Sequence, residues 1–297
     1  MMHLGSIDDL TNEDVNHILD RAEALRCGAE LRLRPRQVLS LAFFQSSTRT
    51  RVGFAAAGIR LGMGPVDLWA ERYDEAMSSP ESLADTIRVV TAYSDVMVFR
   101  HPSREAWAEA VAVAQCPLIN CGNSGDEHPT QALIDGFAIR RAFGRLDGLR
   151  VGIVGDVAGS RSAHSLMRLL ARFRPSEVRL MGPESRVGGA VADSWVSGPA
   201  RSSVSVVHEL DVRELDVVYF AGLPEGEGSG RLATSVRRRF MLTRERLQVL
   251  PDSAIVLCPL PRVDEIAREL DRDARCRHFA QSDGGGWLRM AILERRS

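Results

Sequence analysis

Phe43-Phe44-Gln45-Ser46-Ser47-Thr48-Arg49-Thr50-Arg51 is the stretch around which the rest of the chain is interpreted. The apolar run 38–44 leads into it and is typical of a buried strand in a parallel sheet. Residues 52–61 follow with the apolar spacing of a helix. The stretch therefore joins the carboxyl end of a strand to a helix N-terminus, where unpaired backbone N–H groups and the helix dipole favour a bound anion.

The side chains of this stretch add donors that suit phosphate. Ser47, Thr48 and Thr50 contribute hydroxyl donors, and Arg49 contributes a planar guanidinium that matches phosphate oxygens. The alternative is a helix cap followed by two solvated arginines. A cap needs one hydroxyl and one or two residues, not five. The sequence thus predicts a phosphate-binding segment, called the cradle below and comprising residues 47–51.

The composition limits the kind of protein that carries this segment. At 297 residues the chain is long enough for two α/β domains. A net charge of -1 argues against a nucleic-acid-binding surface or a strong attraction to membranes. The chain contains no lysine, so all 38 basic residues are arginine. A Schiff-base lysine and a P-loop lysine are therefore excluded.

Cysteine usage and hydropathy point to a cytoplasmic protein. The five cysteines are odd in number and form no C-x-x-C pair, which is simplest to explain by reduced thiols. The N-terminus lacks the charged and apolar regions of a signal peptide. No stretch approaches the roughly 18 apolar residues of a membrane span. We expect no metal site.

The glycine-rich segment 152–159 invites a nucleotide-binding interpretation that its spacing does not support. Its glycines follow the pattern G-x-x-G-x-x-x-G. A dinucleotide loop needs G-x-G-x-x-G with an acidic residue about 20 positions later. We therefore expect no nucleotide cofactor, and indeed no cofactor of any kind. We expect this segment instead to position Arg161 at the carboxyl end of a strand, where open α/β sheets bind ligands.

Strands and helices are predicted to alternate along the whole chain. This alternation indicates two doubly wound parallel-sheet α/β domains with the active site in the cleft between them. We expect the first domain at 1–134, the second at 135–285, and a final helix within 286–297 that packs back on the first domain and brings Arg289 towards the cleft. The expected strands are 38–44, 65–68, 95–99, 117–120, 151–154, 178–181, 204–207, 217–220 and 255–257. The expected helices include 52–61, 82–92, 104–115, 129–143, 162–173 and 287–296.

Several motifs at the expected strand ends occur in the order found in one known family. Together they span residues 43 to 266 and resemble the aspartate/ornithine carbamoyltransferases, most nearly the catalytic chain of the aspartate enzyme. A single such motif would be weak support, whereas several in family order make chance similarity improbable. The motifs are the cradle, Leu83-Ala84-Asp85-Thr86, Arg100-His101-Pro102, His128-Pro129-Thr130-Gln131, Gly155-Asp156 through Arg161, and Pro259-Leu260-Pro261-Arg262-Val263-Asp264-Glu265-Ile266.

The resemblance implies carbamoyl phosphate and a small amine acceptor as substrates, and it assigns roles to individual residues. Carbamoyl transfer needs a polarised carbonyl and a neutralised phosphate leaving group, and the donors present suit both tasks. The implied catalytic residues are Arg49, Thr50, Arg100 and His128. The implied carbamoyl-phosphate-binding residues are Ser47, Thr48, Arg49, Thr50, Arg100, His128 and Gln131, with the carbonyls of Pro259 and Leu260. Arg161 is implied to hold the acceptor's α-carboxylate.

Two features of the aspartate enzyme are missing from the sequence. Its mobile loop carries a serine and a lysine that reach a neighbouring subunit, and those positions hold Glu75 and Ser79 here. An arginine and a glutamine that grip the acceptor's second carboxylate are replaced by Gly222 and Pro224. The carbamoyl-phosphate half is therefore expected to be intact and the acceptor half to be altered. The resemblance still implies a homotrimer, with the loop 69–79 donated between subunits.

Three hypotheses follow from this pattern. The leading one is a carbamoyltransferase whose acceptor is a small amino compound other than aspartate, held by Arg161. The second is a true aspartate carbamoyltransferase in which Arg72 and the arginines of 231–239 substitute for the missing groups. The third is a non-catalytic homologue. Retention of the carbamoyl-phosphate residues favours catalysis, because a scaffold has no need of them together.

Overall fold

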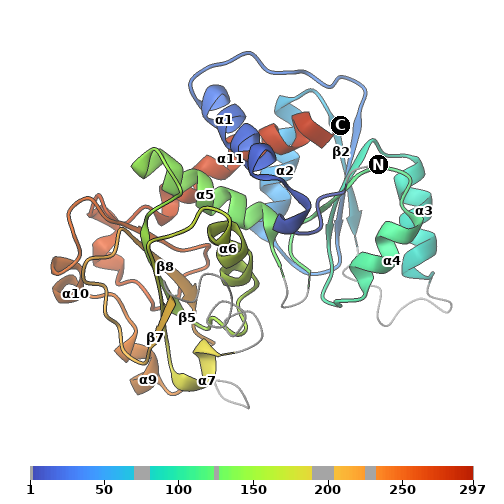
Figure 1. Ribbon diagram of the computed structural model, residues 1–297. Coiled ribbons are helices and arrows are strands. Elements are labelled where there is room, and N and C mark those ends of the chain that lie inside the picture. The colour runs from blue at the N-terminus through green and yellow to red at the C-terminus, as the bar shows by residue number, and fades with distance from the viewer. Residues whose placement is uncertain (1–2, 70–80, 124–126, 189–203, 225–231, 297) are drawn as a thin grey trace. The chain divides into compact units, whose positions relative to one another are not determined.

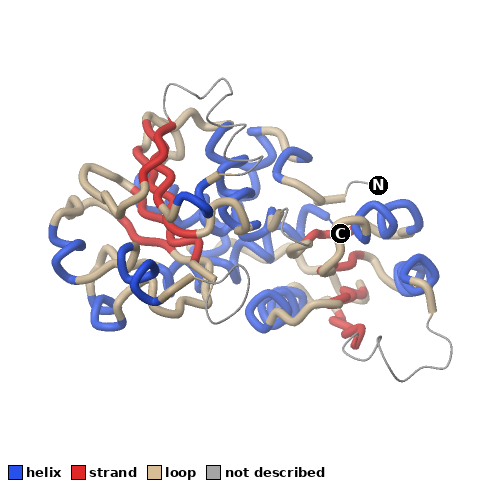
Figure 2. The backbone as a smooth tube through the Cα atoms, turned by 90° about the horizontal axis from the view of Figure 1, so that it is seen from below, coloured by secondary structure: helices blue, strands red, loops and turns tan. Residues whose placement is uncertain are grey.

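The computed structural model describes residues 3–69, 81–123, 127–188, 204–224 and 232–296 (Figure 1). The chain forms two compact units. The first comprises Met1–Ile134 and Asp283–Ser297, and the second comprises Asp135–Ser282. Each unit contains one fully parallel sheet, and Figure 2 shows the strands in two separate groups. The expected fold class, two parallel-sheet α/β domains, is confirmed; the cleft between them stays a prediction.

The first sheet has the strand order β2-β1-β3-β4. Its strands are β1 (Val38–Phe43), β2 (Gly64–Trp69), β3 (Val96–Arg100) and β4 (Leu118–Asn120). All of the pairings are parallel. β1 and β3 are buried along most or all of their length, which explains their continuous apolar sequence.

Helices cover both faces of this sheet. The helices α3 (Leu83–Ala92) and α4 (Ala106–Val113) pack against Ala42, Met97, Phe99 and Leu118. Side chains alternate between the two faces of a sheet along a strand, so Leu39 lies on the face opposite to Ala42. It meets α2 (Thr48–Arg60), where Gly58 leaves room for its side chain. α1 (Asn12–Arg26) begins at the N-cap Thr11, whose hydroxyl accepts from the Asp14 N–H in a capping box.

The second sheet has the order β7-β6-β5-β8-β9. One face packs against a core that includes Val218, Phe220, Val256, Phe240 and Leu247. The strands are β5 (Arg150–Gly155), β6 (Glu177–Met181), β7 (Val204–Val207), β8 (Val217–Gly222) and β9 (Ile255–Leu257). The helices are α5 (Pro129–Phe143), whose first residues belong to the other unit, α6 (Arg161–Ala171), α7 (Glu184–Val187), α9 (Thr234–Arg239) and α10 (Arg244–Gln248).

The last helix corrects a sequence prediction. We expected a helix from residue 287 after a glycine hinge, but α11 runs without a break over His278–Arg296. Glycine costs up to about 1 kcal/mol in a helix interior, which is why three in a row suggested a hinge. Close packing offsets this cost, because a Cβ at Gly285 would lie 2.7 Å from Arg289 Nη1.

Polar contacts hold the end of α11 against the first unit. The guanidinium of Arg21 in α1 donates to both oxygens of the buried Glu294 carboxylate, at 2.5 and 2.9 Å. The backbone N–H of Arg32 donates to the same carboxylate at 3.0 Å. A buried charge held in this way is stabilising only while its partners remain in place.

Other sequence predictions were less accurate at element boundaries. α2 begins at Thr48, four residues earlier than expected, so most of the cradle forms its first turn. The short helices α7, α9 and α10 were not predicted, because they have too few residues to show a helical period. The expected loop 69–79 lies outside the described residues apart from its first residue.

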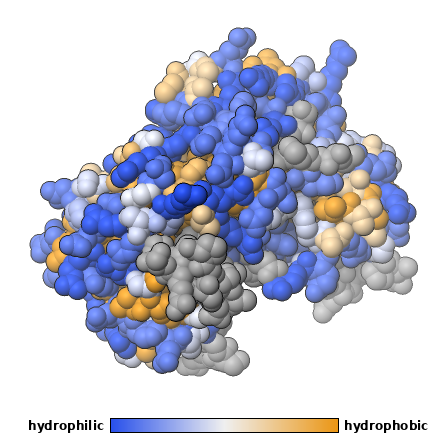
Figure 3. Space-filling view, viewed as in Figure 1, coloured by the Kyte–Doolittle hydropathy of each residue, from blue (hydrophilic) through white to orange (hydrophobic). Residues whose placement is uncertain are grey.

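Hydrophilic side chains predominate on the face drawn in Figure 3. In the described part of the chain, no helix is both long and apolar enough to cross a membrane. Within the same residues, no group of three or more histidine, cysteine or acidic side chains is placed to hold a metal ion.

The carboxyl ends of β5 and β8 come unusually close together. Gly155 has a φ of 118°, and a Cβ at this position would lie 2.3 Å from the carbonyl oxygen of Gly222. The next residue, Asp156, donates its N–H to that same carbonyl at 2.8 Å. A glycine is therefore required where the two strands meet.

We predict that Gly155→Ala destabilises the protein by about 2–5 kcal/mol, because the alanine meets both an unfavourable φ and a backbone oxygen. Urea denaturation followed by circular dichroism measures this loss. Gly144→Ala is the matched control, since Gly144 has a φ of 72° but nothing within 4 Å of its Cβ position. It should cost only about 1 kcal/mol. Equal losses at the two positions would contradict the close approach.

Candidate active site

The predicted phosphate-binding residues lie where the strand order of the first sheet reverses. β1 and β3 are neighbours in the sheet, but the chain leaves β1 for β2 and returns to β3. Open α/β sheets bind ligands at the carboxyl ends of the strands at such a point. The cradle follows β1, and Arg100 is the last residue of β3. The Phe44 N–H donates to the Arg100 carbonyl at 2.9 Å and joins the two strand ends.

The N-terminus of α2 carries no negative charge of its own. Its N-cap, Ser47, makes no side-chain capping hydrogen bond, and the first turn contains no acidic residue. Arg49 and Arg51 occupy that turn. Positive side chains at the positive end of a helix dipole are unfavourable by roughly 0.3–1 kcal/mol each. This arrangement suits the binding of an external anion.

The arginines and hydroxyls of the cradle differ in their surroundings. Arg51 is paired with Asp67 of β2 through a hydrogen bond of 2.8 Å from Nε to Oδ1. Arg49 is exposed to solvent, and Thr50 is buried. The cradle therefore presents Arg49 to a ligand, while Arg51 is held by the neighbouring strand.

Arg100 and His128 are both buried in the first unit. Arg100 Nη1 donates to the Cys121 carbonyl at 3.1 Å. His128 precedes the first residue of α5, and its Nδ1 lies 3.2 Å from the Thr130 hydroxyl. That contact orients the imidazole ring, so that Nε2 is the other ring nitrogen able to act on a substrate. Gln131 is half-buried in the first turn of α5.

A polar network that the sequence did not indicate holds the segment before His128. The buried Glu127 carboxylate accepts from the Ser6 hydroxyl at 2.7 Å and from the Ile7 N–H at 3.2 Å. Asn120 Nδ2 donates to the Gly5 carbonyl at 2.7 Å and to Asn123 Oδ1 at 3.0 Å. The contacts with Gly5, Ser6 and Ile7 join residues more than 100 positions apart in the chain, so no local pattern could reveal them.

In the second unit, Arg161 follows β5 at the corresponding reversal of strand order. It is the first residue of α6, after the N-cap Ser160. His164 Nε2 lies 2.8 Å from the Val157 carbonyl and holds the preceding loop. Burial lowers the pKa of Arg161. A partly desolvated guanidinium at a strand end is well suited to bind a carboxylate.

The loop after β9 carries Pro259 and Leu260. The Cys258 N–H donates to Gln281 Oε1 at 2.9 Å, and Gln281 Nε2 donates to the buried Asp135 carboxylate at 2.5 Å. Leu260 has a φ of 53°, a strained value for a leucine that the surrounding contacts must maintain. Sequence analysis did not single out Gln281 or Asp135, which support this loop from α11 and α5.

Arg262, in the same loop, is a structural residue. Its guanidinium makes two hydrogen bonds with the Asp271 carboxylate and lies 5.6 Å from the centre of the Phe279 ring. The Arg262 side chain is almost completely buried. It anchors the loop and is not placed to meet a substrate.

The residues that differ from the aspartate enzyme are only partly described. Gly222 ends β8, and a Cβ there would lie 3.3 Å from Oε1 of the buried Glu265 carboxylate. Pro224 lies just beyond. The expected substitutes Arg72 and Arg231, and the positions of Glu75 and Ser79, lie outside the described residues. Arg237 is described and is buried in an ion pair with Asp264.

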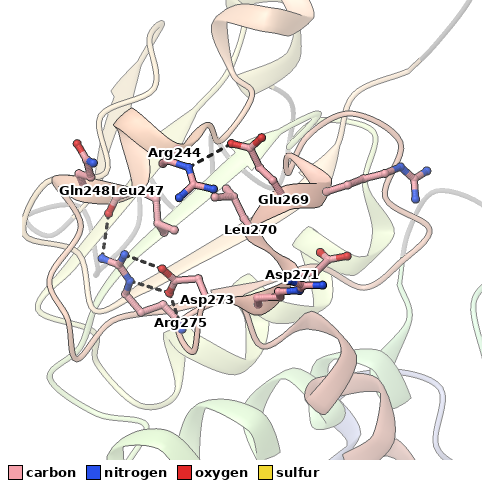
Figure 4. Close-up of a pocket in the computed structure, with 10 residues that line it drawn as sticks. Arg244, Leu247, Gln248, Glu269, Leu270, Asp271, Asp273 and Arg275 are labelled. Carbon is pink, nitrogen blue, oxygen red and sulfur yellow. Dashed lines mark hydrogen bonds and ion pairs between the residues drawn. The ribbon is translucent and has the colours of Figure 1, made fainter.

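A separate hollow of about 940 Å³ opens on the second unit (Figure 4). Its lining comes from α10 and the segment 268–275, and it includes none of the predicted site residues. The charges drawn there are largely paired, since Arg244 Nε lies 3.5 Å from Glu269 and Arg275 Nη2 lies 2.9 Å from Asp273. We assign it no role in catalysis.

The predicted site residues thus fall into two groups, each within one unit. The first contains Ser47, Thr48, Arg49, Thr50, Arg100, His128 and Gln131. The second contains Arg161, Pro259 and Leu260. Family models match both halves of the chain: residues 2–141 match the carbamoyl-P binding domain, and residues 147–295 match the Asp/Orn binding domain, of the aspartate/ornithine carbamoyltransferases. The chain belongs to this family.

Individual relatives agree over nearly the full length of this carbamoyltransferase. The aspartate carbamoyltransferase catalytic subunit of Archaeoglobus fulgidus is 38% identical, covering 99% of this chain and 98% of the relative. That of Thermococcus onnurineus is 37% identical, covering 97% and 94%. A crystal structure of aspartate transcarbamoylase from Trypanosoma cruzi with carbamoyl phosphate and aspartate has a TM-score of 0.88 and 32% identity, covering 98% and 94%. The expected family resemblance is confirmed, and the protein is an enzyme.

Proposed function

We propose that this carbamoyltransferase transfers the carbamoyl group of carbamoyl phosphate to the amine of aspartate and releases phosphate. The observation that carries the proposal is the full-length similarity to enzymes named for aspartate, including one solved with both substrates. This was our second hypothesis from the sequence, and the comparisons favour it over the leading one, an acceptor other than aspartate. The two relatives described are catalytic subunits, which argues against a non-catalytic homologue.

The proposed roles follow from the chemistry of the two groups of residues. Ser47, Thr48 and Arg49 hold the phosphate at the N-terminus of α2, together with Arg100. Thr50, Arg100 and His128 donate to the carbonyl oxygen, which becomes negative as the amine adds. A preorganised donor of this type is worth about 3–4 kcal/mol. Gln131 and the carbonyls of Pro259 and Leu260 accept from the carbamoyl NH2.

Bond changes in the proposed reaction need no covalent enzyme intermediate. The amine nitrogen forms a bond to the carbonyl carbon, and the bond from that carbon to the bridging oxygen breaks. Phosphate departs with the electron pair, and the amine gives up its proton to the departing phosphate or to solvent. Arg161 binds the α-carboxylate and so orients the amine. The enzyme contributes position and electrostatic stabilisation.

A second candidate acceptor, a small amine without a second carboxylate, is favoured by one observation. Where the aspartate enzyme has an arginine, Gly222 offers no side chain, and the buried carboxylate of Glu265 faces it. A carboxylate placed there loses charged hydrogen bonds worth about 1.5–3 kcal/mol each and meets a like charge. If aspartate is the acceptor, its second carboxylate is bound weakly or by residues beyond this position.

The first prediction concerns the cradle. Arg49→Ala should weaken carbamoyl phosphate binding by at least ~30-fold, because a charge-assisted contact in a desolvated site is worth about 2–5 kcal/mol. Isothermal titration calorimetry measures the affinity. Arg51→Ala is the matched control, since Arg51 is in the same turn but is paired with Asp67; it should stay within about threefold of the wild type. Equal affinity in the wild type and Arg49→Ala would remove the cradle from the proposal.

The second prediction concerns the acceptor. Aspartate should support phosphate release that depends on carbamoyl phosphate. If two charged hydrogen bonds to its second carboxylate are missing, the KM for aspartate should be on the order of a hundredfold higher than in an enzyme that makes them. Glu265→Gln should lower that KM several-fold without changing the KM for carbamoyl phosphate, because it removes the like charge. Steady-state assays of aspartate, asparagine and alanine decide between the candidates. Turnover of a neutral amine at lower concentration than aspartate would support the second candidate.

We also propose the homotrimer and the cytoplasmic location that sequence analysis led us to expect. The trimer rests on the family resemblance, in which a loop from one subunit completes the site of the next. Light scattering should give about 98 kDa, three times the 32.7 kDa chain. The measurement should be made at micromolar concentration with and without carbamoyl phosphate. A monomer under both conditions would contradict the trimer.

A further inference from the structure

Arg289 of α11 is a buried arginine whose environment is unlike that of an ordinary structural arginine. It is 7% exposed. Among the described residues, no oxygen accepts a hydrogen bond from it, and its buried Nε has no partner. Its described neighbours are the Phe54 ring, 5.6 Å from its guanidinium carbon, and two glycines. A buried charge is costly unless an ion or hydrogen-bonding groups compensate it.

The two glycines form a slot for the guanidinium. A Cβ at Gly53 of α2 would lie 2.6 Å from Arg289 Nη1, and a Cβ at Gly285 of α11 would lie 2.7 Å from the same atom. The side chain therefore occupies the volume that a larger residue on either helix would fill. Only glycine at both positions admits the guanidinium this close to the backbone of α2.

This slot places Arg289 directly behind the cradle. Gly53 is four residues after Arg49 in α2, so the two positions are one turn apart on the same helix face, with Cβ positions roughly 6 Å apart. Burial lowers the pKa of Arg289 to about 10. The positive charge of Arg49 also lowers this pKa, whereas Cys121 raises it. Arg289 remains protonated at neutral pH. Two like charges therefore lie close together at the positive end of α2.

Arg100 belongs to the same group of charges. Its guanidinium donates to the Cys121 carbonyl. Burial raises the pKa of the Cys121 thiol to about 12, although the Thr130 hydrogen bond and the charges of Arg289 and Arg100 act to lower it. Arg289 is thus linked electrostatically to Arg49 on α2 and to Cys121 after β4, which Arg100 also contacts, within one unit. An anion bound at the cradle would relieve the repulsion among them.

We infer that Arg289, seated between Gly53 and Gly285 behind Arg49, is a further phosphate-binding residue that supplies fixed positive charge to the cradle. The inference rests on the proposed carbamoyl phosphate site, and it adds a residue that the sequence motifs do not include. It also has a consequence that a structural role would not have. Arg289 destabilises the empty protein and stabilises the protein with a bound anion.

The experiment compares Arg289→Met with Arg21→Met. Methionine is unbranched and fits the slot without charge. Arg21 is the matched control because it also contacts α11, but it neutralises the buried Glu294 carboxylate.

Thermal melts without ligand give stability, and calorimetry with inorganic phosphate gives affinity. For Arg289→Met we expect a melting temperature higher by about 2 °C or more and roughly tenfold weaker phosphate binding. For Arg21→Met we expect a lower melting temperature and phosphate affinity within twofold.

The outcomes separate this inference from the proposed function. Phosphate affinity within twofold of the wild type, or a melting temperature that falls as it does in Arg21→Met, overturns the role of Arg289 while leaving carbamoyl transfer untouched. Conversely, a wild type that binds phosphate through Arg289 but neither binds carbamoyl phosphate nor forms a carbamoylated product overturns the proposed function and upholds the inference. Gly285→Ala is a second variant. It keeps the arginine but fills the slot, and it should also weaken phosphate binding.

Discussion

Positive charge concentrated at the carboxyl edge of the first sheet is the constraint on which the proposed site depends. The N-terminus of α2 has arginines in its first turn and no acidic residue, and two more arginines lie buried nearby. Each of these features is unfavourable in the empty protein. Their concentration at one point is understandable if an anion binds there.

The fold allows this concentration because the rest of the molecule holds the charged groups in place. β1 and β3 are buried and parallel, so their carboxyl ends meet at one edge of the sheet. Glu127 ties the segment before His128 to the N-terminal residues, and the Arg21–Glu294 pair holds α11 against α1. These contacts support the segments that carry the proposed donors. Positioning and binding are therefore carried by different residues.

The second unit shows the same separation between support and recognition. Gly155 and Gly222 bring β5 and β8 together, and Gln281 and Arg262 hold the loop of Pro259 and Leu260. The supporting contacts in this unit are made by buried groups that are hydrogen-bonded or closely packed. At the end of β8, by contrast, a glycine faces a buried carboxylate. The support of the second unit is thus built from contacts distant in the chain, whereas the end of β8 lies beside a single buried carboxylate.

The sequence by itself determined the fold class and the family, and it predicted the segments that we propose to carry the chemistry. Apolar runs, helical periods and motifs such as 47–51 and 128–131 are local patterns, which can be recognised from the sequence alone. Only the tertiary structure decided that α11 continues through its glycines, that Arg51 is engaged by Asp67, and that Arg289 lies behind Arg49. Each of these depends on residues distant in the chain. Glycine signals a hinge when considered alone, but packing against another helix turns the same residue into the space that a buried guanidinium needs.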